Sequence, residues 1–160
     1  MKRTIIKNGC VYEDGKIIKK NIAFENGLIT DADFHGDIYE NDTVIDAFDK
    51  YVCPGFIDIH LHGGGGFDFM DGTDEAFCGF VNSHLKSGTT TLIPTTITCS
   101  DNSLYKLFKI YRKFSAKYPQ LHGIHLEGPF LSYEKKGAHD ERYLRVPSEY
   151  DIDNLLYETC

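Results

Sequence analysis

Two histidines and an aspartate alternate along an apolar stretch that runs into four glycines, FIDIHLHGGGG at residues 56–66. Successive side chains of a β-strand point to opposite faces, so Asp58, His60 and His62 are predicted to lie on one face. Two neutral imidazoles at this spacing can bind one metal ion, and the glycines would let a ligand approach the backbone closely. The alternative is a pair of hydrogen-bonded histidines at a polar strand end, followed by a flexible turn.

A second polar group lies in GIHLEGPF at residues 123–130. Glu127 precedes Gly-Pro, which is expected to end a strand at the edge where barrel enzymes carry their active sites. A buried carboxylate is costly unless it is paired or binds a metal, so Glu127 is predicted to be a metal ligand. A structural ion pair with a Lys or Arg is the alternative. His125 is expected to form a hydrogen bond behind the site.

The chemistry of this donor set points to hydrolysis. His-x-His with a carboxylate suits zinc or iron better than magnesium or calcium. Such a metal lowers the pKa of bound water towards 7 and polarises a carbonyl, as amide or ester hydrolysis requires. The loop KKGAHD adds Lys135, Lys136 and His139, which could clamp a substrate or polarise its carbonyl. A charged surface loop without such a role explains these residues equally well.

The sequence pattern that predicts secondary structure changes near residue 50. Before it, short β-type runs are separated by Asn8-Gly9, Asp14-Gly15 and Asn26-Gly27. These dipeptides are strong hairpin signals, so a small antiparallel sheet is predicted.

After residue 50, strand and helix patterns alternate. Strands are expected at 52–62, 89–97 and 121–131. Helices are expected at 74–88, with Asp74 as a possible cap, at 101–114, and from Pro147 onward. The residues expected on their apolar faces are Phe77, Phe80, Val81 and Leu85, then Leu104, Leu107, Phe108 and Tyr111, and finally Ile152, Leu155 and Leu156. Three βα units with buried strands predict a parallel sheet.

Composition narrows the class of protein. The chain has 160 residues, 41% of them apolar, and a net charge of -7, which indicates a globular protein and argues against a general binder of nucleic acid or membrane surfaces. Its cysteines are scattered without a CxxC pattern, and it has no signal-peptide core or membrane-spanning run. A reducing, cytoplasmic setting is therefore expected.

Chain length leaves two architectures open. A closed (β/α)₈ barrel needs about 250 residues, more than remain after the small sheet. The chain is therefore expected to be either a small open α/β sheet or the front part of a larger barrel protein.

These motifs, in this order, resemble those of the amidohydrolase superfamily, with PGFIDIHLHG at the first barrel strand and SGTTTLIPT at the second. Within it, HLEGPFL followed by KKGAHD is similar to the N-acetylglucosamine-6-phosphate deacetylase family. The resemblance implies an α/β fold in which residues 51–160 form the first three βα units of a (β/α)₈ TIM-type barrel. Residues 1–50 would form part of a small β-sandwich-like domain.

The resemblance also implies site roles. Glu127 would hold the principal metal, and His60 and His62 a second one, so one or two divalent ions are expected, zinc or alternatively iron. His139, with Gly137 and Ala138 of the same loop, would contact the acetamide of the substrate. The implied reaction converts N-acetylglucosamine 6-phosphate to glucosamine 6-phosphate and acetate. Dimers are expected of the full-length family, with this small amino-sugar phosphate as the binding partner.

The resemblance implies that no catalytic base lies within the chain. Two further metal-binding histidines and the general-base aspartate would lie beyond Cys160, so a truncated deacetylase is expected. Two alternatives stay open. One is a non-catalytic fragment that dimerises or complements a missing C-terminal half, and the other is an amidohydrolase that acts on cyclic amides.

Overall fold

The computed structural model describes residues 3–159 and divides into two compact units, one ending at Pro54 and the other beginning at Gly55. The sequence predicts a small β-sandwich-like domain at residues 1–50 and a partial barrel at residues 51–160. That identification of the two domains stays a prediction. The described cysteines Cys10, Cys53, Cys78 and Cys99 are free thiols, and Cys160 lies outside the described residues.

Two tight hairpins form the first part of the N-terminal unit. Strand β1 (Thr4–Glu13) pairs antiparallel with β2 (Lys16–Glu25), which pairs antiparallel with β3 (Leu28–Asp31). Both connecting dipeptides, Asp14-Gly15 and Asn26-Gly27, have positive φ angles, as a type I′ turn requires. These two hairpin predictions are confirmed.

The rest of this sheet differs from the expectation. Strands β4 (Thr43–Asp46) and β5 (Tyr51–Val52) pair parallel with β1, so the sheet is mixed and the purely antiparallel prediction is wrong. The reason is that the chain after β3 crosses to the opposite side of β1 instead of forming another hairpin. Asn8-Gly9 is not a turn either, because it lies inside β1, where the pairing register shifts and Asn8 has a φ of 61°.

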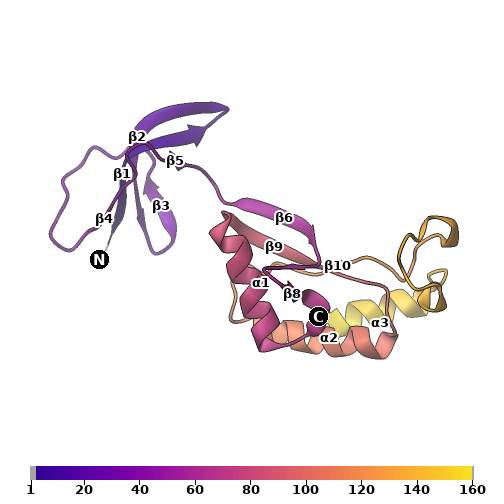
Figure 1. Cartoon of the computed structure of the whole chain (residues 1–160). Helices are drawn as coiled ribbons and strands as arrows, with labels where there is room; N and C mark the ends of the chain where they lie inside the picture. Colours follow the sequence, from indigo (N-terminus) through magenta and orange to yellow (C-terminus); the bar gives the residue numbers. More distant parts are fainter. Residues whose placement is uncertain (1–2, 160) are drawn as a thin grey trace. The chain divides into compact units, whose positions relative to one another are not determined.

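The C-terminal unit contains the parallel sheet that the sequence predicts. Strands β6 (Phe56–Leu61), β9 (Thr89–Thr96) and β10 (His125–Leu126) pair in the order β10-β9-β6, and both pairs are parallel. Helices α1 (Asp74–Lys86) and α2 (Asp101–Ser115) lie on one side of it (Figure 1). The unit is therefore a mixed α/β structure.

The apolar stripes of α1 and α2 form the main core, as expected. Phe77, Phe80 and Val81 of α1 are fully buried, and Leu107 and Tyr111 of α2 pack in the same cluster. The cap of α1 differs from the expectation, because the Thr73 side chain, not Asp74, accepts the Ala76 N–H at 3.1 Å. In α3 (Glu149–Thr159) only Leu155 of the expected face is buried, whereas Ile152 and Leu156 are 42% and 59% exposed.

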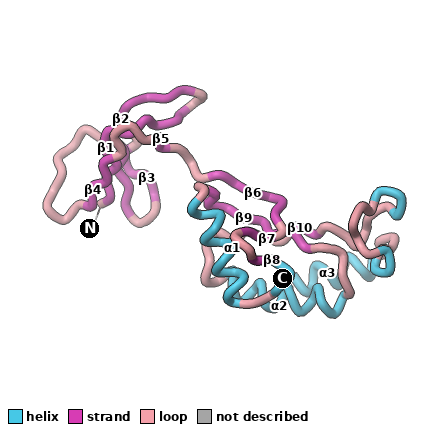
Figure 2. Tube along the Cα trace, viewed as in Figure 1, coloured by secondary structure: helices cyan, strands magenta, loops and turns pink. Residues whose placement is uncertain are grey.

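Short elements lie around the strand ends. The glycine run is built into a small antiparallel ribbon of β7 (Gly63–Gly64) and β8 (Phe67–Asp68), followed by the 3-10 helix η1 (Phe69–Asp71). A long segment with two more 3-10 turns, η2 (Tyr133–Lys135) and η3 (Glu141–Tyr143), connects β10 to α3 (Figure 2). Strand β10 is far shorter than expected, because Gly123 and Gly128 on its two sides take positive φ angles that interrupt the extended backbone.

The expectation that all three strands are buried is wrong for β6. Phe56, Ile57 and Ile59 are 63%, 67% and 64% exposed, and only Leu61 of its apolar side chains is buried. Strand β6 is one of the two outer strands of the sheet and pairs, among the described residues, with β9 alone, so its side chains have neighbouring strand residues on one edge only. Within residues 3–159, no helix has the length and apolar character to cross a membrane.

Candidate metal centre

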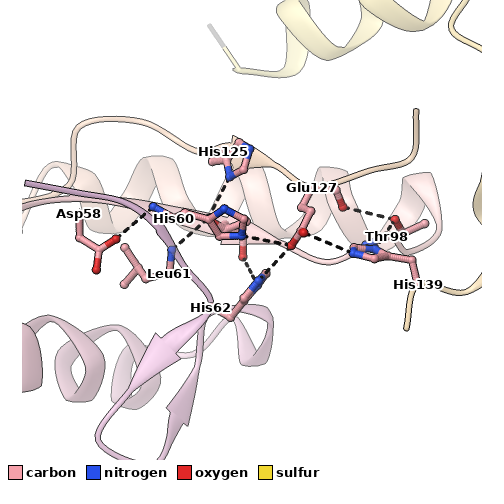
Figure 3. A network of polar contacts seen from close by, with 9 residues as sticks. Asp58, His60, Leu61, His62, Thr98, His125, Glu127 and His139 are labelled. Atoms are coloured by element: carbon pink, nitrogen blue, oxygen red, sulfur yellow. Dashed lines mark hydrogen bonds and ion pairs between the residues drawn. The ribbon is translucent and has the colours of Figure 1, made fainter. Parts of the chain in front are cut away.

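His60, His62 and Glu127 meet at the carboxyl ends of β6 and β10. One ligand atom from each lies within 4.8 Å of the others, and Figure 3 shows the three side chains converging. The shared atom is Glu127 Oε2, which lies 3.4 Å from His60 Nε2 and 3.0 Å from His62 Nε2. Strands β6 and β10 both pair parallel with β9, and this pairing brings their carboxyl ends to the same edge of the sheet.

The backbone after Glu127 admits only glycine. Gly128 has a φ of 92°, a region that residues with a side chain rarely adopt. A Cβ atom at this position would lie 1.8 Å from Thr98 Oγ1. The Glu-Gly-Pro sequence therefore sets the path of the chain as it leaves the carboxylate.

Hydrogen bonds from β9 hold the end of β6 and His62, the residue that follows it. His62 Nδ1 lies 3.2 Å from the carbonyl oxygen of Thr95, and the buried Thr95 hydroxyl accepts the Leu61 N–H at 3.1 Å. The same hydroxyl lies 3.2 Å from His125 Nδ1, and the His125 ring packs edge-on against His60. His125 thus lies behind the site, as the sequence indicates.

The loop after β10 brings His139 to the other oxygen of the carboxylate. His139 Nε2 lies 3.6 Å from Glu127 Oε1, and its Nδ1 lies 2.8 Å from Thr98 Oγ1. A turn closed by the His139 N–H on the Lys136 carbonyl, with Gly137 at a φ of 59°, shapes the loop. Lys136 Nζ donates to the His139 carbonyl at 3.2 Å.

The other loop residues lie outside this group. Gly137, Ala138 and Lys135 are exposed, and their contact with a substrate stays a prediction. Lys136 supports the loop backbone through its bond to the His139 carbonyl.

Burial and the charge of nearby histidines shift the pKa of Glu127 in opposite directions. Desolvation raises the pKa of its carboxyl group. His139, His60 and His62 lower it by attraction, with a hydrogen bond from His60, and the net pKa lies below the usual value. The site therefore favours the ionised carboxylate that a metal ligand must be.

The donor set fits a divalent metal ion. A carboxylate oxygen and the lone pair of a neutral imidazole are both acceptors, so their close approach requires a cation or a proton between them. Two ligands about 2.1 Å from a tetrahedral zinc ion lie roughly 3.4 Å apart. The observed separations of 3.4 Å and 3.0 Å are close to that value.

Asp58 does not join the group, although it shares the expected strand face. Its carboxylate accepts the His60 backbone N–H at 3.1 Å. The register of the β6–β9 pairing shifts between Asp58 and Leu61, and this irregularity breaks the strict alternation from which the prediction was made.

Three supporting residues escaped the sequence reasoning. His84 of α1 places Nε2 at 3.0 Å from the Gly63 carbonyl and so holds the turn after His62. Thr95 and Thr98 lie in a β-branched run that indicates a strand and gives no sign of polar contacts. The Thr-Thr-Ile-Thr spacing at the strand's carboxyl end was the available signal.

Comparisons with known proteins identify the family of the chain. A model of the amidohydrolase family matches residues 51–156. The chain is 35% identical over 148 residues to N-acetylglucosamine-6-phosphate deacetylase of Haemophilus influenzae, covering 91% of this chain and 39% of that protein. It is 32% identical over 156 residues to the Homo sapiens deacetylase, covering 91% and 37%.

Solved structures give the same result. The crystal structure of the Pasteurella multocida deacetylase matches with a TM-score of 0.83 at 30% identity, covering 98% of this chain and 42% of that chain. A D-hydantoinase from Thermus sp. matches with a TM-score of 0.50 at 26% identity, covering 84% and 29%. The chain thus spans about two fifths of the length of the deacetylases it matches. On the match across most of its length, the chain belongs to the amidohydrolase family.

Proposed function

We propose that the protein acts in the metal-dependent deacetylation of N-acetylglucosamine 6-phosphate, which yields glucosamine 6-phosphate and acetate. One observation carries the proposal: His60, His62 and His139 surround the two oxygens of a single carboxylate, Glu127. The similarity to deacetylases supports the choice of substrate.

In this proposal Glu127, His60 and His62 hold one divalent ion, zinc or alternatively iron. The ion, when bound, would supply a Lewis acid that polarises the acetamide carbonyl. His139, on the far side of the carboxylate, would donate a hydrogen bond to the carbonyl oxygen. The second ion that the sequence allows stays a prediction.

We further propose that the unit from Gly55 is the first part of a (β/α)₈ barrel, preceded by part of a small β domain. The parallel order β10-β9-β6 and the TM-score of 0.83 support this assignment. A cytoplasmic location and a dimeric full-length protein remain predictions of the sequence.

Acetate release from N-acetylglucosamine 6-phosphate with added zinc tests the proposal. We expect His60→Ala and Glu127→Ala to abolish turnover and weaken zinc binding measured by calorimetry. His35→Ala is the matched control, because His35 is exposed in the other unit and pairs only with Asp33 among the contacts described.

Two results would count against the proposal. Zinc binding without turnover by the chain would support the non-catalytic alternative. Turnover of a cyclic amide but not of the sugar phosphate would support the other alternative, which the weaker match to the hydantoinase does not favour.

A further inference from the structure

Thr98 follows strand β9 and contacts both Glu127 and His139 of the candidate site. Thr98 is only 6% exposed and lies two positions after the end of β9. Its hydroxyl lies 2.8 Å from His139 Nδ1 and 3.3 Å from the Glu127 carbonyl oxygen, and its backbone N–H points at the same His139 nitrogen at 3.4 Å. Figure 3 shows these contacts together.

The long backbone contact and the closer hydroxyl contact together indicate the tautomer of His139. An amide N–H can only donate, so His139 Nδ1 must accept and cannot bear a proton. In a neutral imidazole the proton then lies on Nε2. That nitrogen faces Glu127 Oε1 at 3.6 Å, so His139 presents an N–H to the site.

His62 has the opposite tautomer for the same kind of reason. Its Nδ1 lies 3.2 Å from the Thr95 carbonyl, which can only accept, so the proton lies on Nδ1. His62 Nε2 is left with a lone pair, 3.0 Å from Glu127 Oε2. Contacts with Thr95 and Thr98, at and just after the end of β9, therefore leave His62 Nε2 able to bind a cation and His139 Nε2 able to donate a hydrogen bond.

We propose that Thr98 is a positioning residue that fixes His139 as a hydrogen-bond donor at this site. The acceptor is the carbonyl oxygen of the acetamide, and this part of the inference rests on the proposed function. The hydroxyl has one proton, and the 2.8 Å contact directs it to His139 Nδ1. The Glu127 carbonyl oxygen at 3.3 Å is the longer, competing acceptor, so the same hydroxyl lies beside the donor and beside the backbone of the metal-binding carboxylate.

Nitrogen NMR of the ¹⁵N-histidine-labelled chain at about pH 8, where an ordinary imidazole is neutral, tests the inference without any turnover. We expect a proton on Nε2 and none on Nδ1 in His139, and the reverse in His62. His84 is an internal control, because its Nε2 faces the Gly63 carbonyl and must bear the proton. A proton on His139 Nδ1 overturns the inference.

Two substitutions separate the hydroxyl from the shape of the side chain. Thr98→Val removes the 2.8 Å hydroxyl contact and leaves only the longer 3.4 Å contact of the backbone N–H. We therefore expect mixed His139 tautomers and about a 10- to 100-fold loss of turnover. Thr98→Ser keeps the hydroxyl, and we expect it to retain the single His139 tautomer and the turnover of the unsubstituted chain. An unchanged tautomer in folded Thr98→Val overturns the inference, and if that variant fails to fold, the wild-type and Thr98→Ser spectra decide. Correct tautomers without turnover contradict the proposed function alone.

Discussion

Glu127 joins groups that come from distant parts of the chain. Its two oxygens face histidines from β6 and from the loop after β10. Residue types and spacing were enough to predict His60, His62 and Glu127 as a group. They were not enough for Thr98, because its part depends on a contact with His139 that only the folded chain creates.

Substitution of Gly128 tests how tightly this region is packed. A left-handed φ costs an alanine roughly 1–2 kcal/mol, and displacement of Thr98 adds roughly 1–3 kcal/mol to the loss of unfolding free energy in Gly128→Ala. Gly137→Ala is the control, because its φ is also positive but its Cβ would meet nothing within 4 Å. Equal losses in urea unfolding would contradict the packing argument.

At the scale of the elements, periodicity predicted the helices well and the strands less well. The stripe of α2 was correct because four large apolar side chains recur at helical spacing and find a core. The burial of β6 was wrong because burial depends on a neighbouring layer, which alternation along one strand cannot reveal. The parallel pairing of β4 with β1 likewise depends on a long connection and not on a local signal.

The cap of α1 offers a direct comparison of two adjacent residues. Thr73→Ala removes the side-chain acceptor of the Ala76 N–H, and we expect a loss of about 1 kcal/mol in unfolding free energy. Asp74→Ala removes a favourable charge in the first turn, worth roughly 0.3–1 kcal/mol, and exposed ion pairs with Lys113 and Lys117 that contribute little. A larger loss for Asp74→Ala in urea unfolding would reverse the assignment of the cap.

The residue that caps η3, Asp140, has a carboxyl group with a strongly lowered pKa. Side-chain and backbone hydrogen bonds from Arg142 lower the pKa of Asp140 from 3.8 to about 2. Because the folded pKa is below the unfolded value, the stabilisation is present above about pH 4 and is lost as the pH falls towards 2. We expect a carboxyl NMR titration midpoint near 2, and a higher midpoint that stays below 3.8 in Arg142→Gln, because the backbone N–H of residue 142 still donates to the carboxylate.

At the scale of the whole molecule, each unit has its own core. Phe77 is fully buried in the C-terminal unit, where its ring stacks on Phe114, and Ile5 is fully buried in the N-terminal unit with Ala23 and Phe34. The sequence indicated the change of character near residue 50 through its turn dipeptides and apolar periods.

Separate cores predict separate responses to core substitutions. We expect Phe77→Ala to cost roughly 3–5 kcal/mol and Ile5→Ala roughly 2–5 kcal/mol. Each loss should be confined to its own unit in hydrogen exchange measured residue by residue. Loss of protection across both units in either variant would show that they unfold together.

The exposed side chains of β6 also have a consequence for the protein in solution. Phe56, Ile57 and Ile59 are exposed apolar side chains on an outer strand, where they can associate with other molecules. A net charge of -7 makes the molecules repel one another. Salt screens that repulsion and leaves the apolar attraction in place. We therefore expect dilute, low-salt solutions to stay clear and concentrated, high-salt solutions to become turbid.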